Sequence, residues 1–209
     1  MTQLVNAADH GVPQRRERVF FVGFREDTNV SWHFPQATHS RDALVWDQLH
    51  GTYWDRHKVA RKQRPVGKGA GASLDPKTPP SEKPWRTVWD AISDLPDPEG
   101  ATTFDIPVSN HRLQPGARSY PGHTGSPIHE PAKTLKAGVH GVPGGENMLL
   151  LPNGRVRYFT VRESARLQTF PDEFVFHGSW SETMRQLGNA VPVKLAEVVG
   201  KSVARHVGA

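Results

Sequence analysis

Short apolar runs separated by long stretches rich in Gly and Pro set the pattern of this chain. Residues 18–24 read RVFFVGF without polar alternation, which predicts a strand buried on both faces of a parallel sheet. Residues 87–96 carry apolar side chains at i, i+3, i+4 and i+7, so they predict a short helix that Pro96 stops. Residues 102–157 predict short strands and long loops, with a turn at Asn153-Gly154.

Three signals predict helices in the last quarter of the chain. Thr160 and Glu163 have the spacing of a capping box, in which each side chain satisfies a backbone amide of the other residue. Ser179 and Glu182 repeat this spacing, and Pro192 lies where a further helix begins. One apolar stripe follows along that last helix, formed by Leu195, Val198, Val199 and Val203.

Length and composition indicate a folded, loop-rich protein. The chain has 209 residues, enough to bury a sizeable core, with 19 glycines, 18 prolines and a hydrophobic share of 36%. No apolar run approaches the ~20 residues of a membrane span, and the N-terminus lacks the features of a signal peptide. We therefore expect a soluble, cytoplasmic protein with no membrane partner.

Charge and cysteine content narrow the chemistry. The formal net charge of +5 suits a polyanionic partner, although many proteins without one share such a balance. The absence of cysteine excludes disulfides, thiolate zinc sites and a cysteine nucleophile supplied by this chain. The 11 histidines include no pair spaced i, i+4, so we predict no metal site.

A basic run occupies residues 56–68, within a stretch dominated by Trp, His, Gly and Pro. It holds six Lys and Arg residues and no acid, and we interpret it as a loop. Two roles stay open at this point: the run could follow a DNA backbone, or it could be a solubilising insert. A phosphate contact would give DNA binding a steep salt dependence.

Three segments together resemble the DNA (cytosine-5) methyltransferase family. They read GVPQRRERVFFVGF from Gly11, RYFTVRESARLQTFPDEF from Arg157, and QLGNAVPVKLAEVVG from Gln186. In order and separation they are similar to the family's eighth, ninth and tenth motifs. Residues 116–147 also resemble the target-recognition region of some bacterial members. The similarity covers nearly the whole chain, least of all residues 29–84.

The resemblance implies an α/β fold, an incomplete S-adenosylmethionine-dependent methyltransferase (Rossmann-like) domain with a smaller, mostly β and loop target-recognition domain. We assign residues 1–99 and 178–209 to the catalytic domain and 100–177 to the recognition domain. The family's Gly-rich loop, Pro-Cys motif and Glu-Asn-Val motif are missing from the sequence. A start methionine thirteen residues before Gln14 is similar to members split into two polypeptides, although a gene fragment would look identical.

The eighth-motif resemblance assigns the catalytic role to Gln14, Arg16 and Arg18. One arginine reaches O2 of a flipped cytosine while the other braces the site or a phosphate. An always-charged, planar donor suits the negative charge that develops on the ring. The alternative interpretation is a solvated turn with an internal ion pair, which the following strand and the later motifs make less attractive.

The ninth and tenth motifs suggest a scaffold and a cofactor contact. The scaffold residues, which in the family organise the recognition domain and its junction with the catalytic core, are Arg157, Thr160, Arg162 and Glu163. Arg162 is expected to be buried against a carboxylate. The tenth motif implies that Asn189, with backbone from Ala190 and Val191, contributes to the S-adenosylmethionine pocket. A capped surface helix and a plain Gly-Asn helix terminator are the respective alternatives.

The target-recognition resemblance suggests a DNA contact built from small, hydroxyl and basic residues. Glycine permits close backbone approach, while Thr, Lys and Arg reach phosphates and base edges in the major groove. The candidates are Arg118, Thr124, Lys133, Thr134 and Lys136. A Gly-rich surface loop with incidental charges is the alternative, and no base assignment is made.

Two hypotheses of different classes follow. In the first, the chain is the DNA-recognition half of a DNA (cytosine-5) methyltransferase, inactive alone, whose partner polypeptide supplies the Gly-rich loop and nucleophilic Cys. It acts on double-stranded DNA in a bacterial cytoplasm. In the second, it is a stand-alone DNA-binding module or an inactive remnant. An exposed apolar face on the strand at 19–24 and on the helix bearing Leu195 and Val199 would favour the split enzyme.

Overall fold

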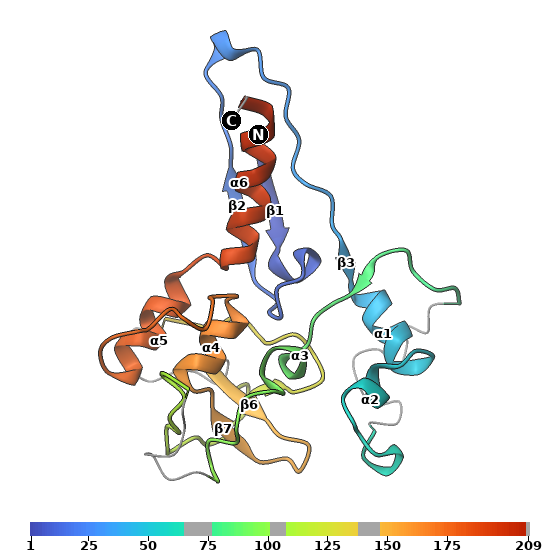
Figure 1. Cartoon of the computed structure of the whole chain (residues 1–209), viewed down its shortest axis with the longest axis vertical. Coiled ribbons are helices and arrows are strands. Elements are labelled where there is room, and N and C mark those ends of the chain that lie inside the picture. Colours follow the sequence, from blue (N-terminus) through green and yellow to red (C-terminus); the bar gives the residue numbers. More distant parts are fainter. Residues whose placement is uncertain (65–76, 101–107, 138–146, 208–209) are drawn as a thin grey trace.

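The computed structural model describes residues 1–64, 77–100, 108–137 and 147–207. Figure 1 shows an upright stalk above two lobes, with both termini near the top of the stalk. We call these parts the stalk (residues 1–38 and 192–207), the larger lobe (86–100, 108–137 and 147–191) and the smaller lobe (39–64 and 77–85). The end of the basic run, at residues 65–68, lies outside the described residues.

The stalk is a two-stranded hairpin with one helix along it. Its elements are β1 (Thr2–Asn6), η1 (Ala7–His10), β2 (Glu17–Phe21), η2 (Glu26–Thr28) and α6 (Val193–Val207). The strands are antiparallel, in a register that pairs Leu4 with Val19. Leu195 and Val199 of α6 pack with Val5 of β1, and Val203 packs against the same cluster. The predicted stripe is therefore confirmed at Leu195, Val199 and Val203.

The prediction that residues 18–24 form a parallel strand buried on both faces is wrong. β2 pairs antiparallel with β1, and burial alternates along it, leaving Phe21 80% exposed. The physical reason is that α6 packs on one face of the hairpin, while Leu4, Val19 and Phe21 on the other face stay exposed. An apolar strand of this kind is usually buried on both faces, but the described residues bury only one face of β2.

The larger lobe surrounds a small mixed sheet. Its elements are α3 (Val88–Ile92), β5 (Ser126–Pro127), β6 (Met148–Leu150), β7 (Val156–Tyr158), α4 (Val161–Leu167) and α5 (Trp180–Asn189). The strand order is β5-β6-β7, with β5 and β6 parallel and β6 and β7 antiparallel. The predicted turn at Asn153-Gly154 joins β6 to β7. Leu135, Leu149, Phe159 and Leu187 form part of its buried core.

Local capping explains where the helices of this lobe begin. Thr160 and Glu163 form the predicted capping box at the start of α4. Thr87 and Asp90 form another at α3, which ends at Ile92, ahead of the predicted stop. At α5, the Ser179 hydroxyl accepts from the Glu182 amide, but the Glu182 carboxylate pairs with Arg185 instead of closing the box.

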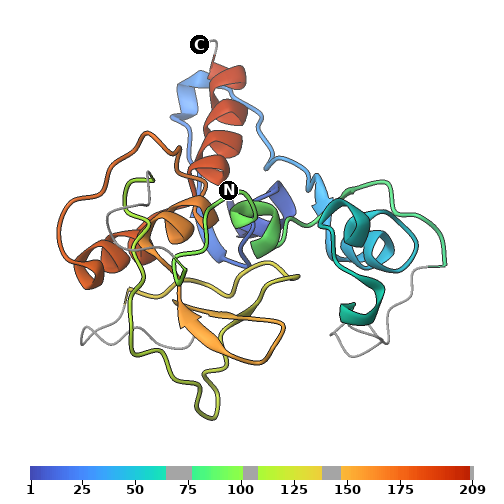
Figure 2. The same cartoon turned by 60° about the horizontal axis from the view of Figure 1, so that its bottom comes forward.

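The smaller lobe holds short helices in a stretch where the sequence predicted only the basic loop at residues 56–68. It contains β3 (His39–Ser40), α1 (Arg41–Leu49), α2 (Tyr53–Arg56), η3 (Arg61–Gln63) and β4 (Lys83–Pro84). Ser40 caps α1 by accepting from the Ala43 amide, and Leu44, Tyr53 and Trp54 form a buried cluster. Figure 2 shows this lobe beside the larger lobe, and Tyr53 of α2 donates its hydroxyl to Thr87 of the larger lobe at 2.9 Å. The domain boundaries at 99 and 177 remain predictions.

Candidate active site

The QRRER segment lies buried where the stalk meets the larger lobe. Arg16 is 1% exposed, although arginine is rarely buried without a carboxylate partner. Its Nη1 donates to the Leu135 carbonyl at 3.1 Å and its Nη2 to the Gly188 carbonyl at 2.7 Å. This one side chain therefore joins three segments. They are the QRRER segment (residues 14–18), residues 116–137, which we call the recognition segment after their family resemblance, and the GNAV turn (residues 188–191).

Further hydrogen bonds, from the backbone and from the Gln14 side chain, also join the QRRER segment to the recognition segment. Gln14 is fully buried; its Oε1 accepts from the Leu135 amide at 3.3 Å and its Nε2 donates to the Leu167 carbonyl at 3.4 Å. The Arg15 amide donates to the Ala132 carbonyl at 2.8 Å. These bonds fix the chain immediately before Arg16, so its position depends on contacts distant in sequence.

The environment of Arg16 favours the neutral form of its guanidinium more than water does. Burial is the larger cause and the nearby positive charge of Arg18 the smaller, and together they lower the pKa of Arg16 to about 10. The side chain is still protonated at neutral pH. Its Nε has no hydrogen-bond partner among the described residues. The hydrogen bonds from its Nη atoms to two carbonyls are therefore what offsets the cost of burying this charge.

Arg18 stands two residues further along β2 in a different environment. Its side chain is partly exposed, and its Nη1 donates to the carbonyl of Glu17, its own neighbour, at 2.6 Å. A bond to an adjacent exposed carbonyl is easily exchanged for another acceptor. The two arginines therefore differ: Arg16 is committed to the fold, and Arg18 is accessible.

The GNAV turn is held against the recognition segment by a close backbone approach. A Cβ atom at Gly188 would lie 2.6 Å from the Lys136 carbonyl carbon and 2.7 Å from the Ala137 Cα atom. Only glycine permits this approach without displacing backbone. The tenth-motif glycine is thus explained by packing on the recognition segment.

The residues predicted to meet the cofactor follow this glycine. Asn189 and Val191 are exposed. The Ala190 amide closes the end of α5 by donating to the carbonyls of Gln186 and Leu187, at 3.0 and 3.2 Å. An exposed amide side chain beside an apolar one fits the edge of a pocket for a small, partly polar molecule, whereas the Ala190 N–H is already used.

Gln168 is a buried junction residue that the sequence reasoning did not single out. Its Nε2 donates to the Leu187 carbonyl at 2.8 Å, and its own carbonyl accepts from the Val193 amide at 3.0 Å. It thereby connects the end of α4 to both α5 and the start of α6. Its place within the ninth-motif segment was the available signal.

The ninth-motif residues form a closed scaffold. Arg157 donates from both Nη atoms to Glu163, at 2.7 and 2.6 Å, and the Thr160 amide donates to the same carboxylate at 2.8 Å. Burial alone would lower the pKa of Arg157, but the hydrogen bonds and charge of Glu163 outweigh it and raise that pKa. The pair is buried on both sides.

Arg162 lies near a carboxylate, although carbonyls accept its hydrogen bonds. Arg162 is fully buried as predicted, but it donates to three carbonyls, those of Ser109, Pro171 and Phe174. The nearest carboxylate, that of Asp172, is largely exposed and 3.6 Å away. Carbonyls of neighbouring loops therefore hold this arginine chiefly, because the buried carboxylate of the motif is taken by Arg157.

His111 is a second residue that the sequence reasoning missed. It is fully buried; its Nδ1 lies 2.8 Å from the Thr160 hydroxyl and its Nε2 lies 2.7 Å from the Pro96 carbonyl. Since a carbonyl can only accept, Nε2 donates to Pro96. No spacing in the sequence points to this connection.

The predicted DNA-contact residues differ in their availability. Arg118 and Thr124 are exposed, and Lys133 donates from Nζ to the Thr124 hydroxyl at 3.2 Å. Thr134 donates its hydroxyl to the Arg15 carbonyl at 2.6 Å, so it belongs to the junction. The Lys136 side chain is exposed, while its backbone is held by Asn147.

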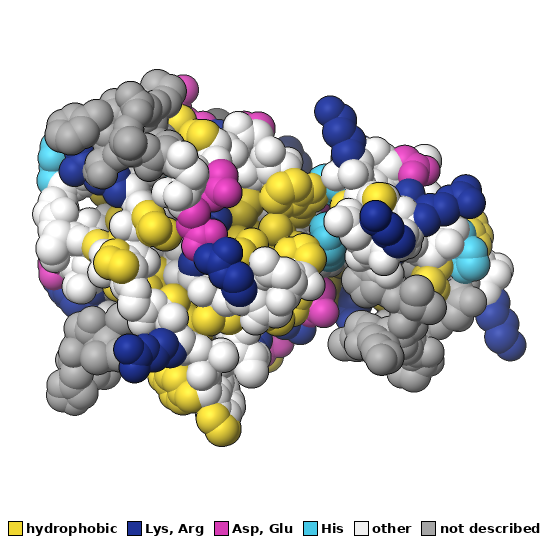
Figure 3. Space-filling view, turned by 90° about the horizontal axis from the view of Figure 1, so that it is seen from below, with side chains coloured by type: hydrophobic (Ala, Val, Ile, Leu, Met, Phe, Trp, Pro, Cys, Tyr) yellow, Lys and Arg dark blue, Asp and Glu magenta, His cyan; other side chains and the backbone are white. Residues whose placement is uncertain are grey.

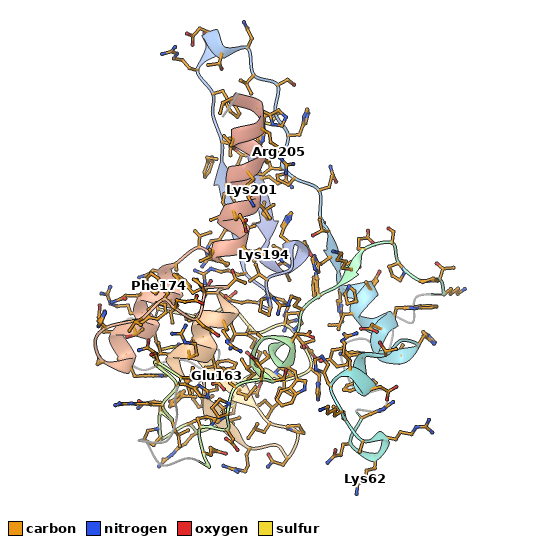
Figure 4. The ribbon with its side chains drawn as sticks, in the orientation of Figure 1. Lys62, Glu163, Phe174, Lys194, Lys201 and Arg205 are labelled. Atoms are coloured by element: carbon orange, nitrogen blue, oxygen red, sulfur yellow. The ribbon has the colours of Figure 1, made fainter. Side chains whose placement is uncertain are left out.

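Basic side chains are spread over the underside of the molecule (Figure 3). They lie on the smaller lobe at the right and on parts of the larger lobe at the left, with acidic groups between. Figure 4 places Lys62 at the tip of the smaller lobe and Glu163 inside the larger lobe, while Lys194, Lys201 and Arg205 follow α6. The described residues contain no cluster of metal ligands and no helix able to cross a bilayer.

Comparison with known proteins defines the class to which this junction belongs. The C-5 cytosine-specific DNA methylase family matches residues 1–205. The type II methyltransferase M.NgoFVII of Neisseria gonorrhoeae is 36% identical over 95% of this chain and 48% of its own length. M.SacI of Streptomyces achromogenes is 32% identical over 97% of this chain and 50% of its own.

The chain therefore belongs to the C-5 cytosine-specific DNA methylase family. It is related to type II methyltransferases, from bacteria and, for M.MthTI at 29% identity, from Methanothermobacter thermautotrophicus. It spans about half the length of the curated relatives that it matches. The mixed α/β structure is consistent with part of such a methyltransferase domain. The family uses S-adenosylmethionine and acts on DNA, and this chain lacks cysteine.

Proposed function

We propose that this chain is the DNA-recognition half of a DNA (cytosine-5) methyltransferase. The complete enzyme methylates carbon 5 of a flipped cytosine in a specific duplex sequence. The chain has no cysteine, so the thiolate that attacks carbon 6 of the ring comes from a partner polypeptide with the Pro-Cys motif. The chain alone is inactive.

The two arginines divide the eighth-motif role between them. Arg18, partly exposed on β2, donates to O2 of the flipped cytosine, where negative charge accumulates during attack. Arg16 is a positioning residue, because both of its Nη atoms already bond to carbonyls inside the protein. Gln14 supports the same junction through the Leu135 amide.

S-Adenosylmethionine supplies the methyl group when bound. This chain contributes one edge of its pocket, through the Asn189 side chain and the exposed Val191. The Ala190 N–H takes no part, since it closes α5. The partner's Gly-rich loop holds most of the cofactor.

Double-stranded DNA lies against the recognition segment. Arg118, Thr124 and Lys133 present exposed or half-exposed polar groups of this segment, and Lys136 lies next to the GNAV turn. The hydroxyl of Thr134 binds Arg15 and so couples this segment to the QRRER strand. A change in the recognition segment is therefore transmitted to the base site by direct contact.

One observation carries the proposal: Arg16 joins the QRRER, recognition and GNAV segments in a single buried contact. The test mixes the chain with the unmatched half of the Neisseria gonorrhoeae relative and measures transfer of labelled methyl groups to DNA from a host without cytosine methylation. The relative's own two halves, mixed in the same way, serve as the positive control.

We expect methylation from the mixture and none from either polypeptide alone. A chimera that joins the same two polypeptides through a flexible linker removes the dependence on affinity. A folded chimera without activity, beside an active control, would contradict the proposal. Methyl transfer by the chain alone would contradict it equally.

A further inference from the structure

The smaller lobe carries more net positive charge than either other part of the molecule. Its described residues hold eight Lys and Arg and four Asp and Glu side chains, a net charge of +4. The stalk has seven basic and five acidic side chains, a net charge of +2, and the larger lobe has ten and nine, a net charge of +1. Clustered positive charge is the electrostatic signature of a polyanionic partner.

The basic side chains near the end of this lobe fall into two groups. Arg56 pairs with Asp47 at 2.9 Å, and its guanidinium lies 5.7 Å from the centre of the Tyr53 ring. Arg64 pairs with Asp55. These two arginines therefore support the fold of the lobe. The side chains of the second group are exposed and make no hydrogen bond or ion pair within the described part of the chain; they are Lys58, Arg61 and Lys62.

The second group lies at the outer end of the smaller lobe, where Figure 4 labels Lys62. Figure 3 shows basic side chains of both lobes on the underside of the molecule. Duplex DNA is stiff over lengths of about 150 base pairs, so a duplex held by the larger lobe extends beyond it as a nearly straight rod. A second set of phosphate contacts on the same face can therefore hold the same duplex.

A buried polar network fixes the smaller lobe on the larger lobe. Tyr53 is fully buried and donates its hydroxyl to Thr87 at 2.9 Å, and Thr87 donates in turn to the Asp90 carboxylate at 2.8 Å. The other oxygen of that carboxylate lies 2.9 Å from Nε2 of His57, on the smaller lobe. A satisfied buried network specifies one arrangement of the parts that it joins. An insert that only improves solubility needs no fixed orientation, whereas a surface that binds a rigid duplex does.

We propose that the smaller lobe is a second DNA-binding surface, which holds duplex DNA outside the recognition sequence. Lys58, Arg61 and Lys62 contact phosphates of the backbone, so these contacts add affinity without reading sequence. The partner is the duplex and not an acidic protein surface, because the lobe shares its face with basic groups of the larger lobe. The inference rests on the proposed function for the choice of ligand, and it extends the DNA contact beyond the recognition segment.

The salt dependence of DNA binding tests this surface. Binding of the full chain to a random-sequence duplex is measured by fluorescence anisotropy at several salt concentrations. The variant Lys58→Ala/Arg61→Ala/Lys62→Ala removes three exposed side chains, so its unfolding midpoint should not change. We expect the slope of log K against log salt to become shallower by about 2.7, the value for three lost phosphate contacts. Affinity near physiological salt should fall by at least about tenfold.

The matched control removes three exposed positive charges from the stalk, with the changes Arg25→Ala, Lys201→Ala and Arg205→Ala. It lowers the net charge of the chain by the same amount and should leave the slope unchanged. Duplex length gives a second readout. The slope of the wild type should increase with length until the duplex spans both lobes, whereas the slope of the smaller-lobe variant should level off at a shorter duplex.

The outcomes separate this inference from the proposed function. Equal losses of slope in the two triple variants would trace the effect to net charge and overturn the inference, and so would an unchanged slope in the smaller-lobe variant. If that variant keeps its DNA binding but associates more weakly with the unmatched half of the Neisseria gonorrhoeae relative, the lobe binds the partner protein and the inference is wrong. A folded, inactive chimera would remove the proposed function, while a loss of slope confined to the smaller-lobe variant would still establish the DNA contact.

Discussion

The α4 region and the β1–β2 hairpin differ in how many of their polar groups and apolar side chains find partners within the described residues. At α4, Glu163 accepts from both Nη atoms of Arg157 and from the Thr160 amide, and all three residues are buried. On the hairpin, Phe21 lies in solvent and one strand edge has no partner among the described residues. The first region is complete within the described residues, whereas the second is left open on one face and along one edge.

The largest effect on stability is expected when the buried Arg157–Glu163 pair at α4 is broken. Glu163→Ala leaves the buried Arg157 without its carboxylate and should lower the free energy of unfolding by about 3–5 kcal/mol. Urea denaturation measures it. The control is Glu182→Ala, which removes an exposed pair with Arg185 and should have no measurable effect. A loss at Glu163 no larger than at Glu182 would contradict the closed scaffold.

The next effect is a difference in stability between variants of Arg16 and Arg18. Arg16→Met leaves the Leu135 and Gly188 carbonyls without a donor and should cost about 2–4 kcal/mol of folding free energy. Arg18→Met removes only a bond to the exposed Glu17 carbonyl, so the unfolding midpoint should hardly change. Equal effects in thermal or urea unfolding would refute the division between a positioning and an accessible arginine.

A smaller effect is expected from pH, at His39 of the smaller lobe and at His129 of the larger lobe, which packs on Tyr53 and Trp54. Burial, the larger cause, and neighbouring positive groups lower the pKa of both His39 and His129 to about 4. The unfolded chain takes up these protons near pH 6.5 and the folded chain only near pH 4. The stabilisation is thus complete above about pH 6.5 and is lost as the pH falls to about 4.

The loss should be on the order of 1 kcal/mol per histidine, after allowance for partial solvent screening. Urea midpoints measured at steps between pH 7 and pH 4 check this. His129→Gln should flatten the profile, whereas the exposed His206→Gln should not. A profile that is unchanged in His129→Gln would show that this histidine is not buried in its neutral form.

The smallest effect concerns DNA. Lys133→Ala should reduce the slope of log K against log salt by about 0.9, the value for one lost phosphate contact. Lys201→Ala is the control, because Lys201 pairs with Glu197 on α6. Binding to duplex DNA is measured with the reassembled complex. Identical slopes for the two variants would remove Lys133 from the DNA interface.

Local features were predictable from the sequence, and distant ones were not. The capping box of Thr160 and Glu163 follows from a three-residue spacing and was confirmed. The partners of Arg16 lie 119 and 172 residues away, so no spacing indicates them. Motif resemblance selected Arg16 as important, but only the fold shows that it is a junction.

The stalk and the smaller lobe show two further limits. The apolar composition of β2 predicts cover on both faces, but the described residues cover only one. The first strand was missed because TQLVN is short and partly polar. Helix α1 was missed although Ser40 offered an N-cap, because the surrounding Trp, His, Gly and Pro residues obscured the periodicity.

The role of Arg18 at the base is tested most directly by the rate of methyl transfer in the reassembled complex. Arg18→Ala should lower kcat by about 10²–10³, as removal of a donor to a developing oxyanion does. Assembly and the unfolding midpoint should stay unchanged. A rate within twofold of the wild type, in a complex that assembles normally, would contradict the account.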